Sequence, residues 1–523
     1  MVEPTPIQDD LWSFLAPSLE AHGRRVAWLC RLLGGRRRRY PYRDIRDHAL
    51  DLAHRLRASG IRSGDVVAIL CPNGPEWGVA ALALWKLGAV VAPLHTGYSD
   101  AELLAAVAAL RPKRVLTHGV DRRLEGGVPI LLEKDPAGIA AEARQTRPRQ
   151  PDAEAVRIYT SGSSGTPKMV RLSHRNIIAN VLAATRCARI EGRDRFLSLL
   201  PLSHMMEITG GLVLPLHAGA TIVLPRVLAA AEILDAMAAE RISVIIAVPR
   251  LYRNIMLGLE KRFRQAGPLL RGYLRLLRAS PLWLRRRLNW PLRRRLGGRI
   301  QAWISGGSRL DPSIARYFRD LGLPLRQGYG LTETAPLICL QEAFDPVLDS
   351  VGRPVAGVTV RIDRPGPDGS GELLCRGPNV MLGYVDKRQT REVMRGGWFH
   401  TGDLARVDDS GRVILTGRSK RLIVTEAGKN VYPEELETLL ERFPEVREAG
   451  VIEVDMRPAA VLAVEGRPQV ETARRVLRRF NARVSGPNRI NRFALVDELP
   501  RTPVGKVAFN KLPEIFAEKE ITG

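Results

Sequence analysis

The sequence predicts an α/β protein whose large N-terminal domain holds two doubly wound sheet units and a small β-rich section, followed by a small α+β C-terminal domain. Short apolar stretches alternate with amphipathic helical stretches from about residue 42 to about residue 330, which is typical of parallel sheets covered on both faces. A Ser/Gly-rich loop at 160–168 interrupts this alternation, so we expect one sheet unit on each side of it. Short strands with Gly and Pro turns follow from Val351 to Val424. We place the domain boundary near Arg418, giving domains at 1–418 and 419–523.

The individual elements before the loop follow from apolar periodicity and from helix end signals. Helices are expected where apolar residues recur every three or four positions, and strands where a short apolar run is bounded by turn residues. Ser99 and Glu102 form a capping-box pattern that should open a helix. We expect helices at 42–60, at 75–87 and from 99 onward, and strands at 65–70, 88–94 and 114–117.

The overall composition is that of a globular protein, but its charge is unusual. Apolar residues make up 45% and charged residues 26% of the chain, whereas 80 Lys and Arg against 55 Asp and Glu give a formal net charge of +25. Such a balance suggests an anionic partner: a nucleotide, CoA, an anionic membrane surface or nucleic acid. The alternative is the preference of a high-GC genome for arginine, which requires no partner.

Cysteine usage and hydropathy indicate a cytoplasmic protein. The five cysteines are scattered without a CxxC pair, which argues against a zinc site or a disulfide framework and is consistent with a reducing cytosol. The opening residues MVEPTPIQDD lack the order of a signal peptide. The longest uncharged run, Ile208–Pro225, is broken by Pro215 and Gly219, so we expect a buried helix, a turn and a strand there rather than a membrane span.

Two basic segments allow alternative interpretations. Leucines, tryptophans and arginines interleave between Arg262 and Arg299, and an amphipathic, Arg-rich helical segment of this kind can lie on an anionic membrane. The alternative is a surface helix pair whose leucines pack inward and whose arginines are solvated. The second cluster, Arg36–Arg39, is interpreted as a solvated turn.

The loop within YTSGSSGTPKMV (159–170) has the composition of an anion-binding loop. Its small and hydroxyl-bearing residues cannot build a core, but glycines let backbone N–H groups approach an anion while hydroxyls and one ammonium complete the cage. It is not a Walker A loop, because Pro167 precedes Lys168 and Met169 follows it. We expect the order strand, loop, helix; the alternative is a flexible linker. The predicted phosphate-binding residues are Thr160, Ser161, Gly162, Ser163, Ser164, Gly165, Thr166 and Lys168.

Four further stretches accompany this loop. They are LPLSHMME (200–207), SGGSRL (305–310) with QGYGLTET (327–334), WFHTGD (398–403) with GRSK (417–420), and RTPVGK (501–506). In this set and order the chain resembles the adenylate-forming superfamily of acyl-CoA synthetases, carrier-loading adenylation domains and luciferases, over nearly its whole length. The resemblance implies ATP, Mg²⁺ and coenzyme A as cofactors.

The resemblance also implies roles for particular residues in nucleotide binding. Glu333 corresponds to the Mg²⁺-associated Glu, with Thr160 as a neighbour; the alternative is a Glu stabilised by a helix N-terminus. Asp403 corresponds to the acceptor of both ribose hydroxyls, and Arg418 to a contact with the same sugar. The residues implied to form the adenine wall are Gly306, Gly307, Ser308 and Arg309, with Gln327, Gly328, Tyr329, Gly330, Leu331 and Thr332.

Catalytic roles are implied for His204, Glu333, Lys168 and Lys506. Lys506 corresponds to the Lys that contacts the substrate carboxylate and the α-phosphate, and His204 to the residue beside that carboxylate; a lone His is otherwise more often a core residue. The C-terminal domain of the family is mobile and rotates between the two half-reactions. Lys420 falls at its hinge, and Gly428 lies where a pantetheine thiol would pass, with an ordinary turn glycine as the alternative.

The acid is expected to be a medium- to long-chain fatty acid, because LPLSHMME, GGSRLDP and the Leu/Arg-rich segment resemble the long-chain branch. Candidate lining residues for an acyl tunnel are Met205, Met206, Ala335, Pro336 and Leu337. The alternatives are an acyl-AMP ligase, an enzyme that loads an acyl carrier protein, or a basic membrane- or nucleic-acid-binding protein on a degenerate scaffold. Nucleic acid is not expected as a partner, whereas peripheral contact with an anionic membrane through 262–299 is an open alternative. The sequence differs from the family pattern at two places. Met169 stands where a glycine is common, and the stretch between Val451 and Val464 looks shortened.

Overall fold

The computed structural model describes residues 7–119, 123–124, 127–130, 132, 150–160, 168–265, 267–425, 430–466, 469–501 and 507–522. Two compact units divide the chain, and each carries its own cores. Unit 1 comprises residues 1–159, 169–359 and 375–397, and unit 2 comprises residues 160–168, 360–374 and 398–523. The predicted boundary at Arg418 falls on the last residue of a strand of unit 2 and stays a prediction.

The first sheet of unit 1 has seven strands in its described part, and its centre is parallel. All four residues of Val90–Pro93 are buried, as expected for a strand with both faces covered. Ser99 opens the helix Asp100–Leu110 with a capping box in which the Glu102 side chain accepts from the Ser99 N–H at 2.8 Å, so this prediction is confirmed. The strand order is β18 (Gly383–Tyr384), β8 (Lys168–Ser173), β7 (Glu154–Thr160), β4 (Val90–Pro93), β3 (Val66–Leu70), β5 (Arg114–Thr117) and β6 (Val128–Pro129).

Within the residues that the structure describes, the second sheet of unit 1 has nine strands, and its middle strands are parallel. The N-terminal strand β1 pairs in parallel with β10, with Trp28 opposite Ile222, so the two N-terminal strands join this sheet and not the one formed by the segments next to them in sequence. The strand order is β15 (Arg353–Pro354), β14 (Cys339–Leu340), β13 (Leu325–Tyr329), β12 (Ala302–Ser305), β11 (Val244–Ala247), β9 (Arg195–Leu197), β10 (Thr221–Leu224), β1 (Val26–Arg31) and β2 (Arg37–Pro41).

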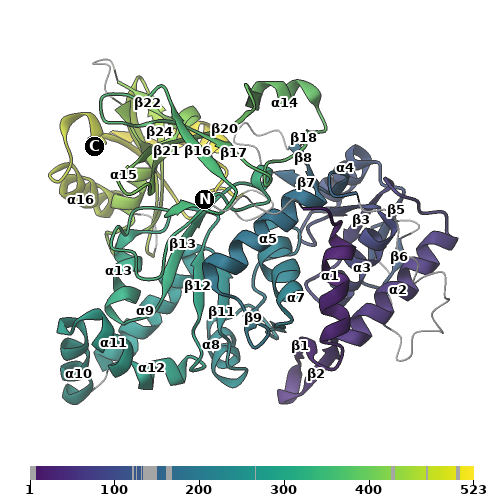
Figure 1. Ribbon diagram of the computed structural model, residues 1–523. Helices are drawn as coiled ribbons and strands as arrows, with labels where there is room; N and C mark the ends of the chain where they lie inside the picture. Colours follow the sequence, from purple (N-terminus) through teal and green to yellow (C-terminus); the bar gives the residue numbers. More distant parts are fainter. Residues whose placement is uncertain are drawn as a thin grey trace. The chain divides into compact units, whose positions relative to one another are not determined.

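Helices flank both sheets of unit 1 (Figure 1). The expected helix at 42–60 is α2, which ends at Ala58, and the uncharged run from Ile208 forms a π-helix (Ile208–Val213), α7 and β10, as predicted. The helices are α1 (Leu11–Ala21), α2 (Tyr42–Ala58), α3 (Pro75–Leu87), α4 (Asp100–Leu110), α5 (His174–Ala188), α6 (Met205–Glu207), α7 (Leu214–Ala218), α8 (Ala230–Ala239), α9 (Pro249–Gln265), α10 (Pro268–Ala279), α11 (Leu282–Leu288), α12 (Trp290–Arg295), α13 (Pro312–Asp320) and α14 (Lys387–Val393).

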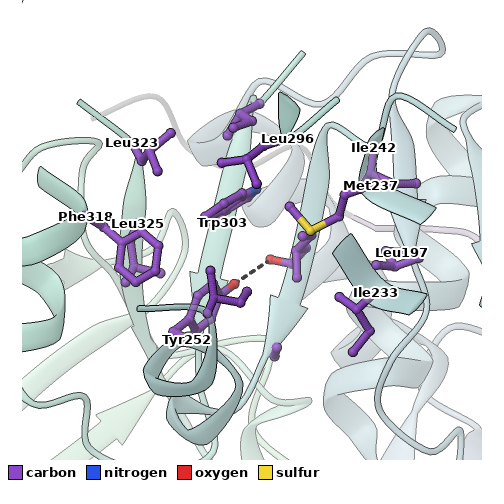
Figure 2. Close-up of a cluster of buried hydrophobic side chains, with 14 of the residues drawn as sticks. Leu197, Ile233, Met237, Ile242, Tyr252, Leu296, Trp303, Phe318, Leu323 and Leu325 are labelled. Carbon is purple, nitrogen blue, oxygen red and sulfur yellow. Dashed lines mark hydrogen bonds between the residues drawn. The ribbon is translucent and has the colours of Figure 1, made fainter. Parts of the chain in front are cut away.

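A large apolar core lies against the second sheet and holds its strands in place (Figure 2). Trp303 on β12 and Phe318 on α13 meet edge to face at 5.7 Å, and Tyr252 on α9 lies 6.0 Å from Phe318. The Tyr252 hydroxyl is buried and donates to the Ile245 and Ile304 carbonyls, at 3.2 and 3.1 Å. The core therefore fixes β11 and β12, and the end of β12 leads into the predicted site residues 306–309.

Unit 2 combines a small β sheet with a C-terminal α+β part. The strands β24 and β25 are joined by a two-residue turn, Asp455–Met456, in which both residues have positive φ, as a type I′ hairpin requires. This tight turn explains why the sequence between Val451 and Val464 looks short. The strands are β16 (Thr359–Asp363), β17 (Gly371–Arg376), β20 (Trp398–Val407), β21 (Val413–Arg418), β22 (Ile423–Val424), β23 (Asn430–Val431), β24 (Val446–Val454), β25 (Arg457–Val464), β26 (Arg492–Val496) and β27 (Glu520–Thr522), and the helices are α15 (Pro433–Leu440), α16 (Val470–Asn481) and α17 (Leu512–Lys519).

Two local expectations from the sequence were wrong. The loop at 160–168 leads into the strand β8 and not into a helix: Val170 and Arg171 of β8 lie opposite Tyr384 and Gly383 of β18, and the helix α5 begins only at His174. Arg36–Arg39 is exposed as expected but is not a turn: residues 37–41 form β2, which pairs with β1, and the Arg37 guanidinium reaches the buried Glu240 carboxylate at 2.6 Å.

Candidate active site

Two glycine-containing segments of the predicted site begin at the same edge of the second sheet. β12 and β13 run parallel, with Ser305 opposite Gln327, so the segments 306–308 and 330–332 leave the sheet at the same edge. Gly306 is buried, and a Cβ added to it would meet the Met206 sulfur at 2.8 Å. The segment carrying His204 is thereby brought against the predicted adenine wall, and a side chain at position 306 would require the Met206 side chain to move.

Unpartnered polar atoms mark the ends of these two strands. Gln341 binds the backbone of Gln327 on both sides: its Oε1 accepts from the Gln327 N–H at 2.8 Å, and its own N–H donates to the Gln327 carbonyl at 2.9 Å. Among the described residues, the buried Gln327 Oε1 and Ser305 Oγ have no hydrogen-bond partner. Buried polar atoms are nearly always paired, so a ligand edge offering both a donor and an acceptor, such as a nucleobase, fits this position.

Glu333 lies in a short 3₁₀ turn (Thr332–Thr334) whose shape depends on Gly330. A Cβ on Gly330 would fall 1.7 Å from the Pro336 carbonyl oxygen, so no side chain is tolerated there. The buried Tyr384 on β18 donates its hydroxyl to Glu333 Oε1 at 2.8 Å, and burial, reinforced by the Glu333 carboxylate, raises the pKa of Tyr384. The Met381 N–H donates to the Glu333 carbonyl at 2.8 Å. Glu333 is therefore oriented by residues about fifty positions later in the chain.

Two asparagines hold the segment that follows Glu333. Asn180 on α5 donates to the Thr334 carbonyl at 2.9 Å and accepts from the Leu337 N–H at 2.7 Å. Asn379 donates to the Leu337 carbonyl at 3.0 Å. The predicted acyl-lining residues Ala335, Pro336 and Leu337 are thus part of a braced segment.

His204 lies at the N-terminus of α6 in a loop that is held by a polar network. The Asn73 amide donates to Ser198 Oγ at 2.9 Å, and Ser198 in turn bonds Glu207 at 2.5 Å. Glu207 is 1% exposed, and burial raises its pKa to about 8. The ring of His95, which follows β4, lies edge-on to His204 with 6.2 Å between their centroids. His204, which the resemblance places beside the substrate carboxylate, therefore contacts a second histidine and lies next to a loop held by the Asn73, Ser198 and Glu207 side chains.

A second group of predicted residues belongs to unit 2 and is organised by the turn HTGD. Asp403 on β20 is buried and faces Arg418 on β21, with 2.9 Å between Oδ1 and Nε. Glu372 braces the turn, because its carboxylate accepts from the Gly402 N–H at 3.1 Å and contacts His400 Nδ1 at 2.9 Å. The result is a fixed carboxylate of the kind that two neighbouring hydroxyls can use.

The remaining predicted residues fall at or beyond the edge of the described structure. Thr160 and Lys168 end β7 and begin β8, and the Thr160 hydroxyl lies 3.5 Å from the Lys168 carbonyl. Residues 161–166, Gly428 and Lys506 lie outside the described residues, as does the side chain of Lys420. Their roles stay predictions.

No three His, Cys, Asp or Glu side chains of the described ranges are grouped so as to hold a metal ion by themselves. A Mg²⁺ ion bound with a nucleotide needs only one or two carboxylates, since phosphates and water complete its coordination. Glu333 fits this requirement, because Tyr384 occupies one carboxylate oxygen and the other can meet a cation.

Sequence reasoning missed the residues that position the site. They are His95, Asn180, Gln341, Glu372, Asn379 and Tyr384, and each contacts a predicted residue or the backbone beside one. Their types are ordinary, and their partners lie far away in sequence. Only the pairing of β18 with β8 brings Tyr384 to Glu333, and no local pattern indicates that pairing.

Comparison with known proteins agrees with this arrangement. A family model described as AMP-binding enzyme matches residues 16–385. Feruloyl-CoA synthase of an Amycolatopsis species is 31% identical over 489 residues, covering 89% of this chain and 92% of its own. A long-chain-fatty-acid–CoA ligase of Mycobacterium bovis is 30% identical over 447 residues, covering 75% and 72%. ATP-bound MatB from Rhodopseudomonas palustris matches with a TM-score of 0.79 at 26% identity, over 98% of this chain and 99% of its own.

The chain therefore belongs to the family of AMP-binding, adenylate-forming enzymes. Within that family it is an acyl-CoA ligase, for which ATP, CoA and a carboxylic acid are the substrates. No helix in the described part of the chain is long and apolar enough to cross a membrane.

Proposed function

We propose that this ligase activates a medium- to long-chain fatty acid. The observation that carries the proposal is the contact of Met206 with the Gly306–Gly307 turn: its Cε lies 3.7 Å from the Cβ position of Gly307. A flexible apolar side chain thus lines the space between His204 and the adenine wall, where an acyl chain would start. The π-helix beyond His204 supports the same proposal, because Thr209 donates to the Ala335 carbonyl at 2.9 Å and the helix is otherwise apolar and buried.

The proposed reaction has two steps. A carboxylate oxygen of the acid attacks the α-phosphorus of ATP, the bond to the bridging α–β oxygen breaks and pyrophosphate leaves. The CoA thiol then loses its proton and its sulfur attacks the acyl carbon, so that the bond to AMP breaks. Lys168 and Lys506 offset the negative charge that gathers in the first step, and Asp403 holds the ribose. Glu333 would hold Mg²⁺, which neutralises phosphate charge when bound.

The test is acid-dependent exchange of labelled pyrophosphate into ATP, across acids from acetate to oleate and including ferulate. We expect exchange to rise with chain length and to be lost in Lys506→Ala, while Lys511→Ala, an exposed lysine nearby, keeps it. Met206→Trp should abolish exchange with oleate and retain it with a short acid. Exchange with ferulate alone would overturn the fatty-acid proposal.

The acceptor is tested separately. We propose CoA, and AMP release on adding CoA, without any carrier protein, is the expected result. Release that requires a phosphopantetheinylated carrier protein would establish the carrier-loading alternative, and accumulation of acyl-AMP with neither acceptor would establish an acyl-AMP ligase.

An aromatic acid such as ferulate is the second candidate for the acid substrate, because the match to the feruloyl-CoA synthase covers more of this chain than the match to the long-chain-fatty-acid–CoA ligase does.

A further inference from the structure

The segment 262–299 concentrates positive charge that it does not neutralise itself. It contains twelve arginines and no Asp or Glu, in a chain whose net charge is +25. It folds into the end of α9 and into α10, α11 and α12, which contact one another in succession. Figure 1 shows these three short helices grouped beside α9 and α13.

The leucines of these helices already have a partner in the core. Leu277 and Leu296 are 0% and 4% exposed and belong to the core of the second sheet, and Leu288 and Leu292 pack against it. Because Leu288, Leu292 and Leu296 recur at every fourth position, they form one stripe along α11 and α12 that faces inward. The expectation that leucines of this segment pack inward is confirmed for these four. They explain the inner face of the helices and not the outer face.

The tryptophans lie on the other face. Trp283 and Trp290 are 63% and 60% exposed, whereas Trp12, Trp28, Trp77, Trp85 and Trp303 are all buried. Leu276 on α10 is 61% exposed as well. Exposed apolar groups of this size gathered in one segment indicate an interaction surface.

Arginines share the face with these tryptophans. The exposed Arg287 follows Trp283 by four residues, and the exposed Arg294 follows Trp290 by four, with its guanidinium 5.2 Å from the Trp290 ring centroid. The helical bonding continues through Asn289, whose N–H donates to the Arg285 carbonyl and whose carbonyl accepts from the Arg293 N–H, both at 2.9 Å. The spacing 283, 287, 290, 294 therefore defines one stripe, opposite the leucine stripe.

We propose that α10, α11 and α12 form a docking surface for an anionic lipid membrane. Arginines pair with lipid phosphates, and tryptophans settle at the boundary between headgroups and acyl chains, where an amphipathic ring is most stable. Arginines alternate with large apolar side chains on this stripe. This matches a lipid membrane, whose headgroups are charged and whose acyl chains below them are apolar. The protein then lies on the membrane, and this contact does not depend on which acid the enzyme activates.

Vesicle flotation at moderate salt tests the proposal. The wild-type chain should float with vesicles that contain about one-third phosphatidylglycerol and not with pure phosphatidylcholine. Trp283→Ala/Trp290→Ala should lower the partition coefficient about ten-fold, and Arg287→Glu/Arg294→Glu at least about 25-fold, since each basic residue contributes about five-fold near an anionic surface.

The matched control reverses two exposed arginines elsewhere in unit 1, Arg24→Glu/Arg388→Glu. It has the same net charge as the segment variant and should keep most of the binding. All variants should unfold at the wild-type temperature, because the changed side chains are exposed. Failure of the wild type to float with anionic vesicles, or equal binding by all variants, would overturn the proposal.

A second readout locates the contact. Vesicles of brominated anionic lipid should quench the fluorescence of the wild-type chain, and Trp283→Phe/Trp290→Phe should abolish that quenching. Quenching that survives in this variant contradicts docking through α11 and α12. Binding to single-stranded RNA that anionic vesicles do not compete would identify nucleic acid as the partner instead and refute the lipid surface.

Discussion

The two arginine-rich regions of unit 1 have similar compositions and opposite surroundings. On β1, β2 and β9, arginines converge on Glu240, the C-cap residue of α8: its buried carboxylate lies 2.6 Å from Arg37, 3.7 Å from Arg195 and 3.9 Å from Arg31. In 262–299, Arg285 contacts Asp320 on α13 at 3.0 Å, and the segment itself has no acid. In the first region, arginines hold a sheet edge to a helix through ion pairs. In the second region, arginines such as Arg287 and Arg294 are exposed on the surface. Composition alone does not distinguish the two.

The largest effect on stability is expected from the first region. Glu240→Gln leaves the Arg37 and Arg195 guanidinium groups facing a neutral amide, while Arg31 keeps Glu232 and Asp235; removing the buried partner of an ion cluster costs about 3 kcal/mol. We expect the midpoint of thermal unfolding to fall by about 6 °C. Asp235→Asn, an exposed partner of Arg31, is the control and should change the midpoint little. If both variants unfold at the wild-type temperature, the contrast between the regions fails.

An intermediate effect is expected from Glu207, which is a buried carboxyl bonded to a hydroxyl instead of an arginine. Burial raises its pKa from 4.5 to about 8, so between these values the folded chain holds a proton that the unfolded chain has released. The contribution of Glu207 to the free energy of unfolding is therefore highest at low pH and falls as pH rises, by about 2 kcal/mol between pH 6 and pH 7.5. Glu207→Gln cannot titrate, so the difference in unfolding free energy from wild type should shift by that amount over this range. Parallel curves for the two proteins would contradict the assignment.

The smallest effect is expected from the second region. Asp320→Asn removes an ion pair with Arg285 whose acid side chain is 35% exposed, so the loss should be about 0.5 kcal/mol. Thermal unfolding should shift by about 1 °C, while binding to anionic vesicles stays the same or increases with the added net charge. If the free energy of unfolding fell as much as in Glu240→Gln, the arginines of 262–299 would also belong to a structural ion cluster.

The sequence predicted what depends on neighbours and failed where distant segments meet. The apolar runs at 65–70 and 88–94 and the capping box at Ser99 could be read locally, and the strands and helix are present. The strand β8 was missed although one of its neighbours, β7, is close in sequence; its other neighbour, β18, lies more than two hundred residues later. The motif around Glu333 was recognised, while Tyr384, which orients Glu333 through a non-local contact, was missed. Motifs identify the reacting groups, whereas the residues that position them are determined by tertiary contacts.

The pairing of β1 with β10 has a consequence for how the chain acquires its structure during synthesis. Trp28 and Ile222 are partners separated by about 190 residues, so β1 and β2, the first strands to leave the ribosome, can pair only with each other until β10 has been made. At typical elongation rates this interval lasts on the order of ten seconds or more. During it the edge of β1 that later meets β10 is unpaired, and Trp28 and Leu29, which are buried in the finished fold, are open to aggregation or to a chaperone. The second sheet can therefore be completed only late in synthesis, whereas the first sheet can begin as soon as β3, β4 and β5 have emerged.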